Sequence, residues 1–427
     1  MLRAIPRLMA AAAVAASVLA SAAMAAPAVL GEPESAGFSP VRLEHVDRML
    51  QGYVDRREVP GVVALIARSG NVVYHRSFGY RDAEAQAAMS NDVIFRIASM
   101  TKPIATVALM MLWENGHFQL RDPISKFLPE FAGMDVAVPV GPADSARGPF
   151  KRVAATNPIT FQHLLTHTAG LPNPYRGITI SLYNEVRANR QPGGTVGDYV
   201  TALAELPLNF EPGAKWEYGP ATDVAGRLIE VISGMSLDQY LREKILTPLG
   251  MTDTHFYMPR SKLARFAALY RPDAEGKIEL AERPDENSRW VSEPHVYFSA
   301  GGGLVSTTTD YFRFHQMMLN GGELDGVRIL GPRTVRLITT NHTGDKAVWL
   351  RGAGFGFGLG YSVTTDLGAS GMPSAVGTYG WGGAYCTVFW VDPDDEVIGI
   401  LMTQIRPYTH LNIRQDFQTL AYQALID

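Results

Sequence analysis

The sequence of 427 residues contains one cysteine, Cys386, and its formal net charge is only -4. A single cysteine excludes an internal disulfide and a metal site built from several thiolates. The basic residues form no stripe, which argues against a nucleic-acid partner. After the N-terminus no apolar run is long enough for a membrane span. What remains is a globular composition, 46% hydrophobic and 19% charged, with enough chain for one large domain or two ordinary ones.

Three common site motifs are also missing. No Gly-x-Ser-x-Gly occurs, which excludes the nucleophile elbow of an α/β-hydrolase. No glycine-rich phosphate loop of the Walker type is present. His163 and His167 are four residues apart, but no glutamate follows His163, so the pair does not match a zinc-protease helix. We therefore interpret both histidines as structural, and expect neither a metal ion nor another cofactor.

The N-terminus has the pattern of a secretory signal peptide. Arg3 and Arg7 precede an apolar stretch over residues 8–23, and Ala23-Met24-Ala25 offers small residues where a signal peptidase reads the chain. We expect residues 1–25 to be removed on export, and we expect the periplasm of a bacterium as the destination.

Strand patterns lie toward both ends of the remaining chain and helical patterns fill its middle. The predicted strands are 61–67, 72–79, 303–306, 358–363, 386–391 and 397–403; the predicted helices are 40–56, 160–166, 200–206, 221–233, 237–245, one capped by Thr309 or Asp310, and 412–426. This order predicts an α+β fold in which helices flank one antiparallel sheet built from both ends. We expect residues 34–100 and 295–427 to form the sheet domain, and 101–294 to form an inserted, mainly helical domain.

The four residues Ser99-Met100-Thr101-Lys102 place a hydroxyl and an amine three positions apart. Residues at this spacing share one helical face, so the Lys102 amine can reach the Ser99 hydroxyl. A serine hydroxyl becomes a nucleophile when a neighbouring base takes its proton, and Ser-x-x-Lys supplies both groups. Residues 104–113 are apolar on every side, and Pro103 costs little only near a first turn. The sequence thus predicts Ser99 at the start of a buried helix.

Tyr218 is the best candidate for a second proton carrier. It lies in Trp216-Glu217-Tyr218-Gly219-Pro220, and a phenol beside an ammonium ion can share one proton with it. The chain has 17 tyrosines, most of which must be structural, so the assignment gains its weight from the surrounding segments.

Those segments together resemble serine hydrolases of the class C β-lactamase type. Residues 95–103 resemble the nucleophile motif of that family, and 210–218 resemble the approach to its catalytic tyrosine. Further similar segments are 164–171, 300–306 and 356–362. These segments occur in the same order as in that family and extend over nearly the whole mature chain. The resemblance implies a β-lactamase/transpeptidase-like fold.

At two motifs the chain departs from β-lactamases and resembles family VIII carboxylesterases instead. Pro220 stands where the second motif carries asparagine, and Trp381-Gly382-Gly383 stands where the third motif reads Lys-Thr-Gly or His-Thr-Gly. Loss of an amide and of a cation favours a more apolar site, suited to a neutral acyl group rather than to an anionic antibiotic.

The resemblance also implies how the site works. Ser99 attacks the carbonyl carbon, and Lys102 and Tyr218 relay the proton to the leaving alcohol. The backbone amides of Ser99 and Ala384 form the oxyanion hole. Gly382 and Gly383 let the substrate approach the backbone closely, while Trp381 either contacts the substrate or belongs to the core.

This interpretation predicts a secreted carboxylesterase that acts on small acyl esters. A β-lactamase, a D-alanyl carboxypeptidase or an amidase with the same fold is the first alternative, with an amide as substrate. An alternative of another class is a non-catalytic binding protein on this scaffold. Residues 205–209 match the deacylating element of class A β-lactamases, but they precede Tyr218, which is the wrong order. We interpret that match as coincidence.

Overall fold

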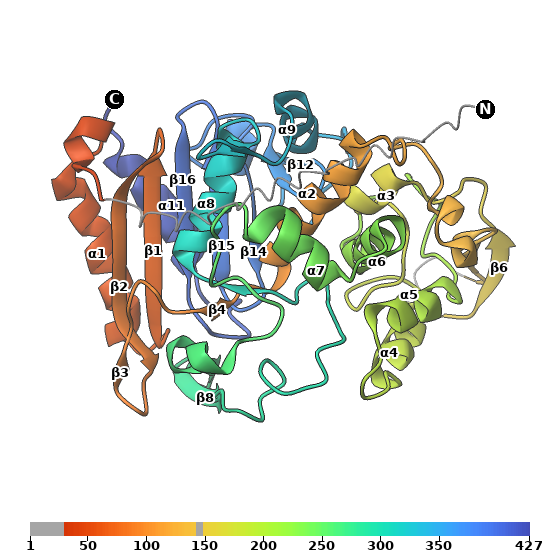
Figure 1. Ribbon diagram of the computed structural model, residues 1–427, viewed down its shortest axis with the longest axis horizontal. Helices are drawn as coiled ribbons and strands as arrows, with labels where there is room; N and C mark the ends of the chain where they lie inside the picture. The colour runs from red at the N-terminus through yellow and green to blue at the C-terminus, as the bar shows by residue number, and fades with distance from the viewer. Residues whose placement is uncertain (1–29, 142–147) are drawn as a thin grey trace, which may run out of the picture.

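The computed structural model describes residues 30–141 and 148–427 (Figure 1). The expected signal peptide, residues 1–25, lies outside the described residues. Within the described ranges, no helix combines the length and the apolar character needed to cross a membrane.

One antiparallel sheet of eight strands forms the centre of the molecule, in the order β12-β13-β14-β15-β16-β1-β2-β3. Strands β1 (Gly61–Arg68) and β16 (Val397–Met402) pair in its middle and so join the two ends of the chain. The other strands are β2 (Asn71–Asp82), β3 (Ala87–Ala88), β12 (Phe355–Phe357), β13 (Ser362–Thr364), β14 (Tyr379–Gly383) and β15 (Thr387–Asp392). The predicted α+β fold, with a sheet drawn from both ends, is confirmed.

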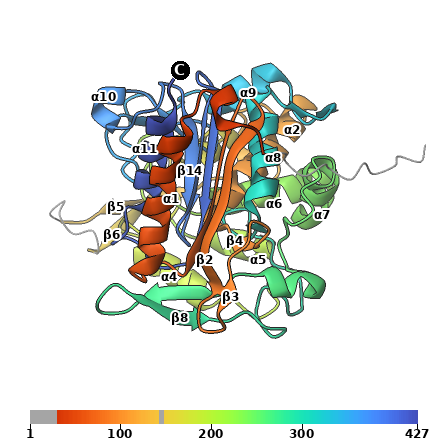
Figure 2. The same cartoon turned by 90° about the vertical axis from the view of Figure 1, so that its left-hand side faces the viewer.

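Helices cover both faces of this sheet (Figure 2). Helices α1 (Pro40–Asp55) and α11 (Ile413–Ala424) lie on one face, while α2 (Thr101–Glu114) and α8 (Thr308–Leu319) lie on the other. Alternate side chains of β1 point to opposite faces, as the period of a strand requires. Val62, Ala64 and Ile66 belong to the apolar cluster that includes α1 and α11. Val63, Leu65 and Ala67 belong to the cluster that includes α2 and α8.

The helical part of the chain lies at the far end of the molecule from α1 (Figure 1). It contains α3 (Phe161–Leu165), α4 (Ile180–Ala188), α5 (Val196–Ala204), α6 (Ala221–Ser233) and α7 (Leu237–Leu241), which continues into a π-helical turn (Arg242–Leu246). It also contains the hairpin of β5 (Asp135–Pro139) and β6 (Phe150–Ala154). The hairpin of β7 (Leu269–Pro272) and β8 (Ile278–Glu282) lies near β3 instead (Figure 1), and the Ile278 amide donates to the Arg57 carbonyl at 2.8 Å. Helix α2 shares its apolar cluster with the sheet strands. The domain boundaries at 101 and 294 therefore stay a prediction.

Short elements complete the described chain. They are the 3-10 turns η1 (Pro33–Ala36), η2 (Ala98–Met100), η3 (Ile124–Lys126), η4 (Pro129–Phe131) and η6 (Arg260–Arg265), the helices α9 (Pro332–Thr339) and α10 (Leu367–Ser370), and the strand pairs β4 (Phe95–Arg96) with β9 (Val305–Ser306) and β10 (Glu323–Leu324) with β11 (Val327–Arg328).

Two local predictions were wrong. Helix α8 is capped by Thr307, whose hydroxyl accepts a hydrogen bond from the amide of Asp310 at 3.1 Å, and not by Thr309 or Asp310. The Asp310 carboxylate is instead bonded to a neighbouring loop. Residues 358–363 are not one strand, because the chain turns there between β12 and β13: the amide of Gly358 donates to the Tyr361 carbonyl at 2.8 Å.

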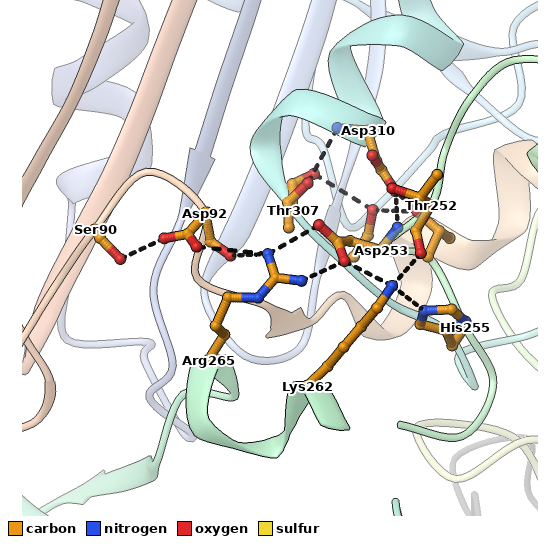
Figure 3. Close-up of polar contacts among 11 residues, drawn as sticks. Ser90, Asp92, Thr252, Asp253, His255, Lys262, Arg265, Thr307 and Asp310 are labelled. Atoms are coloured by element: carbon orange, nitrogen blue, oxygen red, sulfur yellow. Dashed lines mark hydrogen bonds and ion pairs between the residues drawn. The ribbon is translucent and has the colours of Figure 1, made fainter. Parts of the chain in front are cut away.

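A polar network links the loop after α7 to the segment before β4 (Figure 3). The Asp253 carboxylate accepts a hydrogen bond from Arg265 at 2.9 Å and lies 2.8 Å from Lys262 Nζ. Arg265 also lies 3.6 Å from the carboxylate of Asp92. Two cations thus balance the partly buried Asp253, which lowers the pKa of its carboxyl below the ordinary value even though burial alone would raise it.

The same network reaches the strand that leads to Ser99. Asp310 Oδ2 accepts hydrogen bonds from the Asp253 amide at 2.7 Å and from the Thr254 hydroxyl at 2.9 Å. The Thr254 hydroxyl also lies 2.8 Å from that of Ser306, in β9. Because β9 pairs with β4, this nearly fully buried aspartate fixes the chain just before the predicted nucleophile.

The substitution Asp310→Asn tests this carboxyl group. Burial raises the pKa of Asp310 from 3.8 to about 6. Between those two pH values the folded state holds a proton that the unfolded state has released, so the folded state loses stability as the pH rises through that window. Asparagine keeps an acceptor oxygen and does not titrate. Relative to the wild type, its free energy of unfolding should rise by roughly 2 kcal/mol from pH 4 to pH 7.

Urea denaturation at intervals of one pH unit measures this difference. Asp345→Asn, at an exposed position, is the matched control and should give a constant difference. A constant difference for Asp310→Asn as well would contradict the prediction.

Candidate active site

Ser99 lies in the turn η2, which opens directly into α2. Strand β4 brings the chain to this point, where Ile97 donates its amide to Leu304 at 3.2 Å. Ala98 then has a φ of 43°, in the left-handed region that residues other than glycine seldom adopt. This single residue turns the chain from strand to helix and presents the Ser99 side chain. Lys102 and Pro103 lie in the first turn of the buried helix, as predicted.

The structure brings the three predicted proton-carrying side chains together. The Tyr218 hydroxyl donates to Ser99 Oγ at 2.7 Å, and Lys102 Nζ donates to the same atom at 3.2 Å. Lys102 Nζ also lies 4.8 Å from the centre of the Tyr218 ring. Both partners are buried, since Lys102 is 4% and Tyr218 is 6% exposed. The serine hydroxyl therefore lies between two groups that can take up and return its proton.

A second layer of contacts fixes the Lys102 amine. Its Nζ donates to the Gly301 carbonyl at 2.5 Å. Asp223, in the first turn of α6, accepts from the Gly301 amide at 2.9 Å and from the Ser299 hydroxyl at 2.7 Å. Helix α6 thus positions the loop that positions the lysine. Asp223 was not among the predicted site residues, although the segment 218–226 that contains it also resembles the family VIII carboxylesterases.

Aromatic side chains surround Tyr218, among them Trp381 and His167. Trp381 is 6% exposed and directs Nε1 to the Tyr218 hydroxyl at 3.4 Å, so it packs into the core while it borders the site. The His167 ring lies 4.8 Å from the Tyr218 ring. Complete burial, and secondarily the charge of Lys102, hold the pKa of His167 well below its ordinary value, which keeps the imidazole neutral. His163 instead caps the first turn of α3.

The residue before Tyr218 is held by two amide side chains. Glu217 accepts hydrogen bonds from Asn173 at 2.5 Å and from Asn209 at 3.0 Å. Burial raises the pKa of the Glu217 carboxyl above its ordinary value, although these two bonds act against the rise. Asn209 belongs to the segment 205–209 that resembles a deacylating element, and here it holds the side chain of Glu217, the residue before Tyr218.

The end of β14 packs directly on the turn that leads to Ser99. A Cβ atom at Gly383 would lie 2.4 Å from the Ile97 carbonyl oxygen and 2.2 Å from the Thr387 hydroxyl, so only glycine fits. Ala384 follows, and in the described parts of the chain its amide donates to no acceptor. The amide of Ser99 belongs to a first helical turn, where N–H groups have no partner within the helix.

Two cavities meet at Ser99. The first, of about 360 Å³, contains Lys102 and Asp223 in its walls, and the second, of about 370 Å³, follows residues 381–384 of β14 and its turn. Arginines line both of them: Arg187, Arg190, Arg289 and Arg406 the first, and Arg351, Arg406 and Arg414 the second.

This lining differs from the expected apolar site. A Cβ atom at Gly382 would lie 2.1 Å from Nη2 of Arg414, so a guanidinium from α11 lies against the very strand whose motif lacks a cation. Cations that the local motif omits are supplied by segments distant in the sequence. In residues 30–141 and 148–427 no group of three or more His, Cys, Asp or Glu side chains could hold a metal ion.

Known proteins are similar to this chain in sequence and in fold. The sequence model of the Beta-lactamase family matches residues 46–423. Esterase EstB of Burkholderia gladioli is 30% identical over 367 residues, which cover 81% of this chain and 86% of EstB. EstCE1, described as a hydrolase with promiscuous acyltransferase activity, has a TM-score of 0.74 and 26% identity, and the match covers 90% of this chain and 98% of EstCE1.

Simvastatin synthase (LovD) from Aspergillus terreus also has a TM-score of 0.74, with 25% identity over 89% of this chain and 98% of LovD. The resemblance predicted from the motifs is confirmed. Because the family match spans most of the chain and its relatives share the fold, this protein belongs to the Beta-lactamase family and is a serine hydrolase.

Proposed function

We propose that this protein is an exported carboxylesterase that cleaves small acyl esters through an acyl-enzyme on Ser99. The observation that carries the proposal is the position of the Ser99 hydroxyl, 2.7 Å from the Tyr218 hydroxyl and 3.2 Å from Lys102 Nζ, at the junction of two cavities. The description of EstB as an esterase supports it. Export rests on the signal-peptide pattern of residues 1–25.

In the first half of the reaction, Ser99 Oγ attacks the ester carbonyl carbon and passes its proton to the Lys102–Tyr218 pair. The carbonyl oxygen becomes an oxyanion that accepts hydrogen bonds from the amides of Ser99 and Ala384. Collapse of this intermediate breaks the bond to the alcohol oxygen. The proton returns from the pair to that oxygen, so the alcohol leaves neutral and the acyl group stays on Ser99.

In the second half, a water molecule attacks the acyl carbon and gives a proton to the same pair. The bond to Ser99 Oγ breaks, the proton returns to that oxygen, and the carboxylic acid is released. An alcohol in place of water would give a new ester, and the description of EstCE1 as a hydrolase with promiscuous acyltransferase activity shows that one protein of this fold can perform both.

The substitution Ser99→Ala removes the attacking oxygen and leaves the buried partners in place. Hydrolysis of p-nitrophenyl esters should fall at least about 10⁴-fold, because loss of the nucleophile disables the whole set of groups that act with it. The variant should also lack the adduct that a fluorophosphonate forms with the wild type, as detected by mass spectrometry. Initial rates on esters of graded acyl length measure the acyl-chain preference, and the rate on nitrocefin measures β-lactamase activity for comparison.

Ser261→Ala, at an exposed position outside both cavities, should leave rate and labelling unchanged. Turnover by a folded Ser99→Ala protein at the wild-type rate would refute the mechanism. Rapid nitrocefin cleavage with negligible ester hydrolysis would favour a β-lactamase instead. If the wild type hydrolyses none of the esters and amides and forms no fluorophosphonate adduct, a non-catalytic binding protein would be favoured.

The substitution Gly383→Ala tests the oxyanion donor. The new methyl group would collide with the Ile97 carbonyl and push the Ala384 amide away from Ser99. The turnover number should fall about 10²-fold, as on removal of one oxyanion donor, and stability should fall by about 1–3 kcal/mol.

The matched control is Gly368→Ala in the exposed helix α10, where the nearest atom to a new Cβ lies at 3.5 Å. It should keep the wild-type turnover number. An unchanged turnover number for Gly383→Ala would remove Ala384 from the mechanism.

A further inference from the structure

Four arginines converge on the first cavity from segments far apart in the sequence. Arg187 and Arg190 lie at the end of α4 and just beyond it, Arg289 follows β8, and Arg406 follows β16. None of the four forms an ion pair with a carboxylate of the described residues. By contrast, Arg260 pairs with Glu286 at 3.0 Å close to Arg289 in the sequence.

Aromatic rings contact three of these guanidinium groups, those of Arg190, Arg289 and Arg406, and the last lies 5.8 Å from the centre of the Tyr385 ring. Arg190 lies 3.8 Å from the centre of the Tyr297 ring. Arg289 lies 4.8 Å from the Trp290 ring and donates to the Tyr385 hydroxyl at 3.3 Å. A ring attracts a cation through its quadrupole and leaves the charge intact. These three arginines are thus oriented while their charge stays available to a ligand.

The cavity contains little negative charge to balance them. Asp223 is the one carboxylate in the described wall of this cavity, and it already accepts hydrogen bonds from Gly301 and Ser299. The whole chain has a formal net charge of -4, so the positive charge is a local property of the cavity and not of the protein. A cleft lined by one sign of charge concentrates ligands of the opposite sign.

We propose that this first cavity binds a carboxylate carried by the ester substrate, so that the enzyme selects acidic small esters over neutral ones. The inference rests on the proposed function, because it names the substrate class of the same site. A planar guanidinium matches a carboxylate with two parallel hydrogen bonds, which neutral esters cannot accept in the same way. A volume of about 360 Å³ accommodates a small molecule.

Two pairs of substrates test the charge preference at fixed shape. One pair carries the acid on the acyl part: the p-nitrophenyl monoester of glutaric acid and its methyl-capped diester. The other carries it on the alcohol part: 4-acetoxybenzoate and its methyl ester. In at least one pair the acidic ester should have a kcat/KM about tenfold or more above its neutral partner at low salt. The ratio should shrink as sodium chloride is added.

The double substitution Arg187→Gln with Arg190→Gln removes two charges from exposed positions that contribute little to the core. It should bring the ratio of acidic to neutral kcat/KM close to one, mainly by raising KM for the acidic ester. Arg333→Gln, on the exposed surface of α9 and outside both cavities, is the matched control and should keep the wild-type ratio.

Two outcomes would overturn the inference. One is an equal or faster rate on the neutral ester in both pairs; the other is an acid preference that survives the double substitution, which would place the carboxylate elsewhere. Either result leaves Ser99-dependent ester hydrolysis standing. Failure of the proposed function looks different, because then no ester of either pair would be cleaved in a Ser99-dependent manner.

Discussion

The hydrogen bond from Lys102 Nζ to the Gly301 carbonyl, at 2.5 Å, is the contact on which the site depends. Lys102 as a whole is 4% exposed, and a buried amine is tolerable only where acceptors replace the lost water. The carbonyl supplies one acceptor and Ser99 Oγ supplies another. Because Asp223 fixes the Gly301 amide, helix α6 determines where the lysine points, and therefore that its amine contacts Ser99 Oγ.

The sheet provides the opposite wall of the site by close backbone packing. Gly383 leaves no room for a side chain against the Ile97 carbonyl, so the end of β14 is held against the turn that contains Ser99. The β4–β9 pair holds the other side of that turn. Two backbone amides and one hydroxyl are thus placed by main-chain contacts, which vary less than flexible side chains. This arrangement suits electrostatic stabilisation, which needs donors already in position when charge develops.

The sequence was sufficient where the information is local. Spacing placed Lys102 beside Ser99, and the apolar period placed β1 and α2 in the core. It was insufficient where a contact joins distant segments. Asp223 accepts a hydrogen bond from the amide of residue 301, and although both lie in family-like segments, neither segment indicates that the two touch. The error at Thr307 has a similar origin, because the carboxylate of Asp310 is bonded to the loop at 253–254 and not to its own helix.

The charge of the two cavities also depends on contacts between segments that are distant in the sequence. Trp381-Gly382-Gly383 lacks a cation, and a motif taken alone implies an apolar pocket. The field in a cleft is instead the sum over every charge that the fold brings near it. Arg414 arrives against Gly382 from α11, and its charge, after burial, helps to hold the pKa of Arg351 down to about 10. A guanidinium close to another, with no carboxylate beside it, is a cost that an anion in the cleft would relieve. The cavity beside Trp381 is therefore cationic through Arg351, Arg406 and Arg414, although the motif itself contains no cation.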